Sequence, residues 1–276
     1  MFSSCGGQGK SAPQSQGQPG ATEDSAVIAG FGTEGEKRQD SGAFAALLSQ
    51  ALQNSSLPDS AYQEISQRVL GSPSFEGDLA TVLARPEYLR QLVDPWHKLP
   101  DGFAPPDLVA LGSGGSYTVS RNGLMLRRAA ADSFEEMAKA ALADGITLVA
   151  SSTYRSYDYQ VEVHERYARE YGRQEAERFS AKPGYSQHQT GLVIDFGTID
   201  NTFAASPAGL WMEKNASAFG WSLSFPDGTE DITGYTWESW HFRYVGKELA
   251  AFIDNYFGGM QQFALRFIYE WEHLQA

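Results

Sequence analysis

Two short segments of the chain combine histidine with a carboxylate. In the first, His188 precedes Asp195 within Ser-x-His-x-x-Gly-x-x-x-Asp, and in the second, Glu238 precedes His241 within Glu-x-x-His. Two imidazoles and one carboxylate with an open fourth position form a competent catalytic zinc site. We therefore predict one Zn²⁺ per chain, held by His188, Asp195 and His241. Glu238 is then free to act as a general base beside the metal.

The elements around these residues must bring them to one cavity. Asp195 lies in the apolar run 191–197, which predicts a buried strand, and a lone buried carboxylate is costly unless it is paired or binds a metal. Gly191 can turn the chain just before this strand. Glu238 and His241 are an odd number of residues apart, so in a straight strand they would point to opposite faces. We therefore expect Glu238 in the turn before the strand or at a bulge.

Helix and strand patterns alternate around these two segments. Residues 133–145 predict a helix in which Ser133 is the N-cap and Glu136 completes a capping box. Residues 146–153 predict a buried strand that leads through a loop into a second helix, and residues 235–245 predict an aromatic-rich strand. This order of elements predicts an α+β domain with a small sheet.

Composition and periodicity divide the chain into four parts. Residues 1–40 are rich in Gly, Ser and Gln and predict a disordered linker. Residues 41–93 predict a helical appendage, in which Asp59 can cap one helix. Residues 94–257 contain the candidate zinc site. Residues 258–276 predict an amphipathic C-terminal helix, and we expect its apolar face to pack on the domain that carries the zinc site.

The single cysteine, Cys5, excludes an intramolecular disulfide. A run of small residues precedes it and a Gly/Ser/Gln/Pro-rich stretch follows it, as at the cleavage site and tether of a bacterial lipoprotein. The alternative is a free cysteine in a flexible tail. A signal peptide has a positively charged region followed by an apolar region, and no such pattern precedes Cys5. The sequence as given therefore does not show export.

The overall charge excludes some partners. The net charge is −13 and the sequence pI is about 4.8, which argues against a nucleic-acid partner because phosphate binding needs a basic face. The sequence has no run of about 18 apolar residues, so we predict no membrane-spanning segment.

Three motifs in this order resemble one known family. They are "SSTYRSYDYQ", "RFSAKPGYSQHQTGLVIDFG" and "WESWHFRYVG". Together they closely resemble the VanY-type D-alanyl-D-alanine carboxypeptidases, zinc peptidases of the LAS group that also includes lysostaphin-like and Hedgehog-like domains. The similarity extends over about residues 99–246. It implies a small antiparallel sheet that carries the zinc site and is flanked by helices.

The resemblance also implies roles for individual residues. It implies metal ligation by the three residues named above, with Glu238 as the catalytic base. It further implies a catalytic or substrate-binding role for Arg155 and substrate contacts from three more residues. These are Tyr154, Gln160 and Ser186. Whether Arg155 stabilises the oxyanion or binds the substrate carboxylate is left open by the sequence.

Two positions depart from the usual wording of the family. Ser239 stands where a proline often precedes the tryptophan of the third motif, and we expect this change to loosen the loop that carries Glu238. Thr153 stands where a glycine often precedes the tyrosine of the first motif, and we expect it to add bulk at the pocket entrance.

The resemblance implies a zinc D,D-carboxypeptidase that removes the terminal D-alanine from peptidoglycan stem peptides. An L,D-carboxypeptidase acting on tetrapeptide stems shares the same motifs and is the nearest alternative. A cell-wall-binding module without turnover is a second alternative, although a pure binding site does not need Glu238. Because the implied substrate lies outside the cytoplasmic membrane, we expect the protein in the periplasm or cell envelope, with Cys5 as a candidate lipid anchor.

Overall fold

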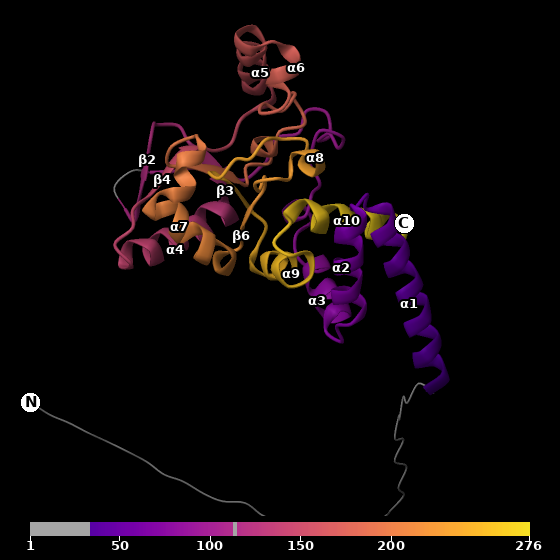
Figure 1. Ribbon diagram of the computed structural model, residues 1–276. Helices are drawn as coiled ribbons and strands as arrows, with labels where there is room; N and C mark the ends of the chain where they lie inside the picture. Colours follow the sequence, from indigo (N-terminus) through magenta and orange to yellow (C-terminus); the bar gives the residue numbers. More distant parts are fainter. Residues whose placement is uncertain (1–33, 113–114) are drawn as a thin grey trace, which may run out of the picture. The chain divides into compact units, whose positions relative to one another are not determined.

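The structure is a computed structural model that describes residues 34–112 and 115–276 (Figure 1). Cys5 and most of the predicted linker 1–40 therefore lie outside the described residues. The helices in the described ranges are α1 (Glu34–Asn54), α2 (Asp59–Leu70), α3 (Phe75–Leu83), α4 (Arg128–Ala143), α5 (Tyr157–Tyr171), α6 (Arg173–Ala176), α7 (Pro207–Asn215), α8 (Glu230–Thr233), α9 (Lys247–Phe257) and α10 (Gln261–His273). The strands are β1 (Leu108–Ala110), β2 (Tyr117–Val119), β3 (Met125–Arg127), β4 (Leu148–Ser152), β5 (Val193–Phe196), β6 (Trp221–Leu223) and β7 (His241–Tyr244).

In the described part of the chain, a five-stranded sheet has the order β2-β4-β5-β7-β6, and β1 pairs with β3 in a separate two-stranded sheet. The predicted α+β class with a small sheet is confirmed. The neighbouring strands β4, β5, β7 and β6 pair antiparallel, but the edge strand β2 runs parallel to β4. Parallel neighbours need a crossover connection, and here α4 lies in the connection between β2 and β4.

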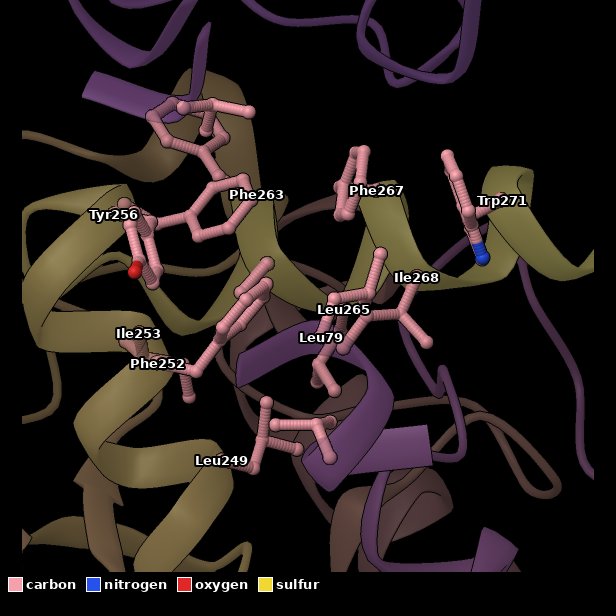
Figure 2. Packing of buried hydrophobic residues seen from close by; sticks show 14 of the residues in the cluster. Leu79, Leu249, Phe252, Ile253, Tyr256, Phe263, Leu265, Phe267, Ile268 and Trp271 are labelled. Carbon is pink, nitrogen blue, oxygen red and sulfur yellow. The ribbon is translucent and has the colours of Figure 1, made fainter. Parts of the chain in front are cut away.

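The described residues bury their apolar side chains in two clusters. One cluster joins α4 and α7 to the five-stranded sheet, with Phe134, Phe196 and Trp221 among its largest members. The other is helical and gathers side chains from α1, α2, α3, α9 and α10. Figure 2 shows this second cluster, in which Leu79 of α3 lies among side chains of the two last helices.

The last helix packs on the end of the domain that carries the candidate zinc site, and also on the N-terminal helices. Its predicted apolar face is buried, including Phe263, Phe267 and Trp271, and it lies in the helical cluster, where it meets α9 of the predicted domain 94–257 together with the N-terminal helices. The start of α10 also reaches the sheet, where Gln261 donates from Nε2 to the carbonyl of Ser222 at 3.2 Å. The amphipathic pattern identified the buried face correctly, but periodicity within one helix does not indicate which surface covers it.

Two predicted helix caps are wrong. The helix α4 begins at Arg128, five positions before Ser133. The hydroxyl of Ser133 is used elsewhere, since it donates to the carbonyl of Phe219 and accepts a hydrogen bond from Trp221. Asp59 is the first residue of α2, whose N-cap position is Pro58 without a side-chain cap. Both caps were expected from the local sequence alone. Alanine favours helix, so the alanine-rich stretch before Ser133 continues the helix toward its N-terminus, to Arg128.

Asp94 ties the segment before the sheet domain to α10. Its Oδ1 accepts hydrogen bonds from the backbone of Trp96 and from both the backbone and Nδ1 of His97, and its Oδ2 accepts one from Gln262. The guanidinium of Arg266 lies 3.7 Å from the same carboxylate. Burial alone would raise the pKa of Asp94, but the hydrogen bonds from His97 and Trp96 outweigh it and lower the pKa below 3.8.

We expect Asp94→Ala to destabilise the protein by about 3 kcal/mol at pH 7, because it leaves buried donors and a cation without their partner. The folded-state pKa is lower than the unfolded-state value, so the charged carboxylate contributes stability above about pH 3.8 and loses it as the pH falls through the folded-state pKa. Urea denaturation at pH 7 and pH 3 therefore should show the difference from wild type shrinking in acid.

Asp101→Ala is the matched control, since this carboxylate is 91% exposed beside Lys98 and exposed pairs contribute little. A loss at Asp94 no greater than that at Asp101 would show that the Asp94 contacts do not stabilise the fold.

Candidate active site

The pairing of strands brings the predicted ligands together. In the register of the sheet, Asp195 of β5 lies opposite His241, the first residue of β7. His188 lies in a short 3-10 turn that ends at Gly191, which adopts the left-handed conformation with φ 70°. A Cβ at this glycine would come within 2.9 Å of Leu108, so the predicted turn requires glycine both for its conformation and for space.

The orientation of His188 follows from one hydrogen bond. Its Nδ1 lies 2.7 Å from the backbone carbonyl of Thr153, and since a carbonyl only accepts, Nδ1 carries the proton. The lone pair is then on Nε2, which lies 3.2 Å from Oδ2 of Asp195. A histidine ligand whose second nitrogen donates to a carbonyl is the arrangement found around metals in proteins.

His241 is oriented in the opposite sense. Its Nδ1 lies 3.2 Å from Oδ1 of Asp195 and 3.2 Å from Oε2 of Glu238, while Nε2 lies 3.3 Å from Oε1 of Gln187. The same Gln187 oxygen accepts a hydrogen bond from the hydroxyl of Ser224 at 2.8 Å. A donor at Nε2 leaves the lone pair of Nδ1 for the metal position.

The donor set fits one zinc ion. Donor atoms of His188, Asp195 and His241 lie within 4.8 Å of one another, and all three side chains are buried. Among the described residues, Nε2 of His188 and Oδ1 of Asp195 are buried without a hydrogen-bond partner, which is costly unless they bind an ion. Two imidazoles and one carboxylate match a catalytic zinc site that keeps a position open.

The two histidines of the site lie in different electrostatic environments. Burial would lower the pKa of His241, but the carboxylates of Asp195 and Glu238 outweigh it and raise that pKa to about 9, so a cation at Nδ1 would take the place of this proton. Burial and the charge of Arg155 lower the pKa of His188, which keeps its imidazole neutral at pH 7 and able to act as a ligand. Burial raises the pKa of Glu238 above 4.5, which strengthens this carboxylate as a proton acceptor.

Glu238 lies in the loop before β7, as predicted, and this loop is held firmly. The backbone of Ser239 donates to Oδ1 of Asn201 at 3.1 Å, and Nδ2 of Asn201 donates to the carbonyl of Trp237 at 3.1 Å. The backbone of Glu238 itself donates to Phe225. The expectation that Ser239 loosens this loop is therefore wrong, because serine supplies an N–H that proline lacks and Asn201 accepts it.

Arg155 lies beside the metal ligands. Its Nη2 is 4.0 Å from Oδ2 of Asp195, and its Nη1 donates to Oε1 of Gln160 at 3.0 Å. Gln160 is fully buried and donates in turn to the carbonyl of Ala181. This arrangement supports a role for Gln160 in positioning Arg155 rather than in touching the substrate.

The other predicted positions do not line the cavity at the metal site. Ser186 is 3% exposed, and Tyr154 is half-buried beside β3, where its backbone donates to Met125. Thr153 is fully buried, and its hydroxyl accepts a hydrogen bond from the backbone of Met125. The expectation that Thr153 narrows the pocket entrance is therefore wrong, since its side chain faces the interior.

A cavity of about 620 Å³ opens onto Asp195 and Glu238. Most of its wall was not predicted from the sequence, and this part includes Arg121 and one face of α5. Four of the members on α5 recur at every fourth position, a spacing that places side chains on one helix face. They are Tyr159, Val163, Tyr167 and Tyr171, and Arg166 of the same helix also lines the cavity. This spacing was the available signal, but it does not indicate that the face borders the site.

Gln187 offers a test of how His241 is positioned. We expect Gln187→Leu to weaken zinc binding about 10- to 100-fold, because partners of a ligating histidine carry effects of this size and leucine cannot accept from Nε2. Competition against a chelator of known affinity measures the change, with circular dichroism as a check of folding.

Gln189→Leu is the matched control, since Gln189 lies in the same turn and is equally buried but bonds to Phe103 rather than to a ligand. Equal zinc affinities in the two variants would exclude a special role for Gln187.

Comparisons with known proteins agree with this geometry. The family model for VanY, D-alanyl-D-alanine carboxypeptidase, matches residues 123–247. The bifunctional D-Ala-D-Ala dipeptidase and D-Ala-D-Ala carboxypeptidase VanXYC of Enterococcus gallinarum is 32% identical over 165 residues, which cover 56% of this chain and 83% of that protein. The chain belongs to the VanY family.

Other relatives share only part of their length with this VanY-family chain. YodJ of Bacillus subtilis (strain 168) is 36% identical over 63% of this chain and 66% of its own length. For the D-alanyl-D-alanine carboxypeptidases of Enterococcus faecium and Enterococcus faecalis, the shares of their own length are 44% and 48%. The chain thus spans less than two thirds of the first curated relatives it matches.

Solved structures of this family have the same fold. The LdcB LD-carboxypeptidase is 34% identical with a TM-score of 0.55, and the match covers 61% of this chain and 85% of that one. A vancomycin resistance D,D-pentapeptidase VanY mutant in complex with Zn(II) is 27% identical with a TM-score of 0.51, covering 60% and 93%. VanYB in complex with D-alanine-D-alanine is 28% identical with a TM-score of 0.52, covering 63% and 94%. The expected zinc cofactor agrees with the second of these structures and with the donor set described above.

Proposed function

We propose that the protein is a zinc-dependent D,D-carboxypeptidase that removes the terminal D-alanine from peptidoglycan stem peptides. The main support for this proposal is that a candidate ligand, a candidate base and an arginine line the same cavity. Asp195, a ligand in the proposed site, Glu238 and Arg155 all border the same space. The VanYB complex with D-alanine-D-alanine supports this substrate class.

The residues of the chain have separate tasks in the proposed reaction. His188, Asp195 and His241 hold the zinc ion, which when bound supplies Lewis acidity that polarises a carbonyl and acidifies water. Glu238 accepts a proton from the attacking water and delivers it to the leaving amine, as its raised pKa favours.

Arg155 is assigned to the terminal carboxylate of the substrate. It is the least exposed arginine of the described cavity wall, with 18% of its side chain accessible, and charge-assisted hydrogen bonds from guanidinium to carboxylate are strong and directional. Gln160 holds the guanidinium in place from behind.

The experiment is incubation of the zinc-loaded protein with pentapeptide and tetrapeptide muropeptides, followed by mass analysis. Loss of one alanine from the pentapeptide supports D,D-activity. Loss from the tetrapeptide supports L,D-activity, a second candidate favoured by the similarity to the LdcB LD-carboxypeptidase. Binding of either peptide without loss of alanine would instead support a non-catalytic cell-wall-binding module.

A substrate of this kind places the enzyme outside the cytoplasmic membrane, in the periplasm or cell envelope. No helix in the described ranges is long and apolar enough to cross a membrane. We propose Cys5 as a lipid anchor. Labelling of cells with a radioactive fatty acid should mark the wild-type protein and leave Cys5→Ala unmarked, whereas equal labelling would exclude the anchor.

A further inference from the structure

The cavity extends well beyond the metal ligands. Asp195 and Glu238 lie on its wall, and the same wall includes Arg121, from the turn after β2, and Arg166 of α5. Its volume of about 620 Å³ is in the middle of the range of small-ligand sites, roughly 300–1,000 Å³. The wall away from the metal site also includes several aromatic rings, which are those of Tyr159, Tyr167, Tyr171 and Phe179.

The charge of this wall is opposite to that of the chain. The protein has 34 acidic and 21 basic residues, yet the charged residues of the described wall, apart from Asp195 and Glu238 at the metal site, are all arginines. They are Arg121, Arg155 and Arg166. With Asp195 committed to the metal and Arg155 to the terminal carboxylate, Arg121 and Arg166 are left for another anionic group.

Arg121 and Arg166, the two outer arginines of the wall, both lie near the hydroxyl of Tyr159. Nη1 of Arg121 lies 3.5 Å from the hydroxyl of Tyr159. The hydrogen bond from Arg121 and the charge of Arg166 both contribute to lowering the pKa of that hydroxyl. The guanidinium of Arg166 also lies 5.2 Å from the ring centre of Tyr167.

Neither outer arginine is neutralised by a carboxylate. Many arginines of the described chain form an ion pair with an acidic side chain, as Arg178 does with Glu230 and Arg127 with Asp107. Within the described ranges, Arg121 and Arg166 have no such partner, and both are exposed to the cavity. Their charges are therefore available to a ligand.

We propose that Arg121 and Arg166 form a subsite for a second carboxylate of the peptide, carried by an acidic residue upstream of the scissile bond. The inference rests on the proposed carboxypeptidase function and adds the substrate class, an acidic peptide. A carboxylate between two guanidinium groups accepts charge-assisted hydrogen bonds, and the tyrosine rings beside them cover the peptide backbone.

Paired peptides test this subsite. Each pair ends in D-alanyl-D-alanine and differs only by glutamate or glutamine at the first, second or third residue before that dipeptide. In wild type, we expect kcat/KM for one glutamate peptide to exceed that for its glutamine partner by about tenfold. The preference should fall as salt is added, because the arginines are exposed.

The Arg121→Gln/Arg166→Gln double variant should hydrolyse both members of each pair with equal kcat/KM, so that the preference for glutamate is lost. Arg169→Gln is the matched control, since Arg169 is an exposed arginine of the same helix that does not line the cavity, and it should keep the preference. A preference of the same size in the double variant overturns the proposal, as does wild type without a preference.

Binding of non-hydrolysable analogues, with the scissile amide replaced by a methylene-amine, separates this proposal from the proposed function. Calorimetry uses the zinc-loaded wild-type protein. Tighter binding of the glutamate analogue with no cleavage of any parent peptide supports the subsite and contradicts the carboxypeptidase. Cleavage with equal binding of both analogues supports the carboxypeptidase and overturns the subsite.

Discussion

Glu238→Gln is expected to keep about one zinc per chain while kcat falls by about 10²- to 10⁴-fold, the usual contribution of a general acid–base residue. Glutamine preserves the shape of the side chain and its place in the loop held by Asn201, but it cannot accept the proton of the attacking water. Metal analysis and steady-state hydrolysis of a D-alanyl-D-alanine peptide measure the two quantities separately.

Two outcomes would contradict this role of Glu238. Loss of zinc would indicate that Glu238 is itself a ligand. Its Oε2 lies 3.2 Å from Nδ1 of His241, close enough to the metal position for this outcome to be tested. Unchanged hydrolysis would assign the base to another group. Glu230→Gln is the control, since this acid of the same segment pairs with Arg178 away from the ligands and its loss should leave kcat unchanged.

Asp195→Ala is expected to abolish both zinc binding and hydrolysis. The aspartate is the anionic member of the ligand set, and it lies within 3.2 Å of both histidines. Without it, zinc content should fall from about one per chain to below about 0.1, since a single carboxylate and two imidazoles provide all the protein ligands of the site.

A chelator gives a second readout for this prediction. A metal that binds only the folded state stabilises it, by about 4 kcal/mol at a thousand times its Kd, so removal of zinc should lower the Tm of the wild-type protein. The Tm of Asp195→Ala should not respond. Asp200→Ala, which removes an exposed carboxylate shortly after the strand, should behave like wild type. A chelator-sensitive Asp195→Ala protein would place the metal elsewhere.

The cluster of candidate ligands was predictable because each of its two motifs is local. His188, Gly191 and Asp195 lie within a few residues of one another, and the glycine conformation expected there is the one observed. The position of Glu238 was also predictable, since the odd spacing from His241 is incompatible with a straight strand.

The surroundings of the site were not predictable, because they depend on contacts between distant segments. Asn201 accepts from Ser239 across a separation that no pattern in either segment indicates. Gln187 resembles any polar residue of a turn until the fold places Ser224 and His241 beside it. Ser133 satisfied every local rule for a helix cap, yet the fold uses its hydroxyl for Phe219 and Trp221.

The helical cluster has a consequence for the order in which the chain folds during synthesis. Helices α2 and α3 leave the ribosome early, but their buried side chains Ile65, Val69 and Leu79 belong to the same cluster as those of α9 and α10 at the other end of the sequence. Figure 2 shows Leu79 among them. Domains generally fold as units during synthesis, from the N-terminus onward. Here α2 and α3 cannot complete their packing until α9 and α10 have been synthesised. The sheet and its candidate metal site can therefore form while the helical cluster is still incomplete. We therefore expect the N-terminal helices to complete their core only after α9 and α10 have been synthesised.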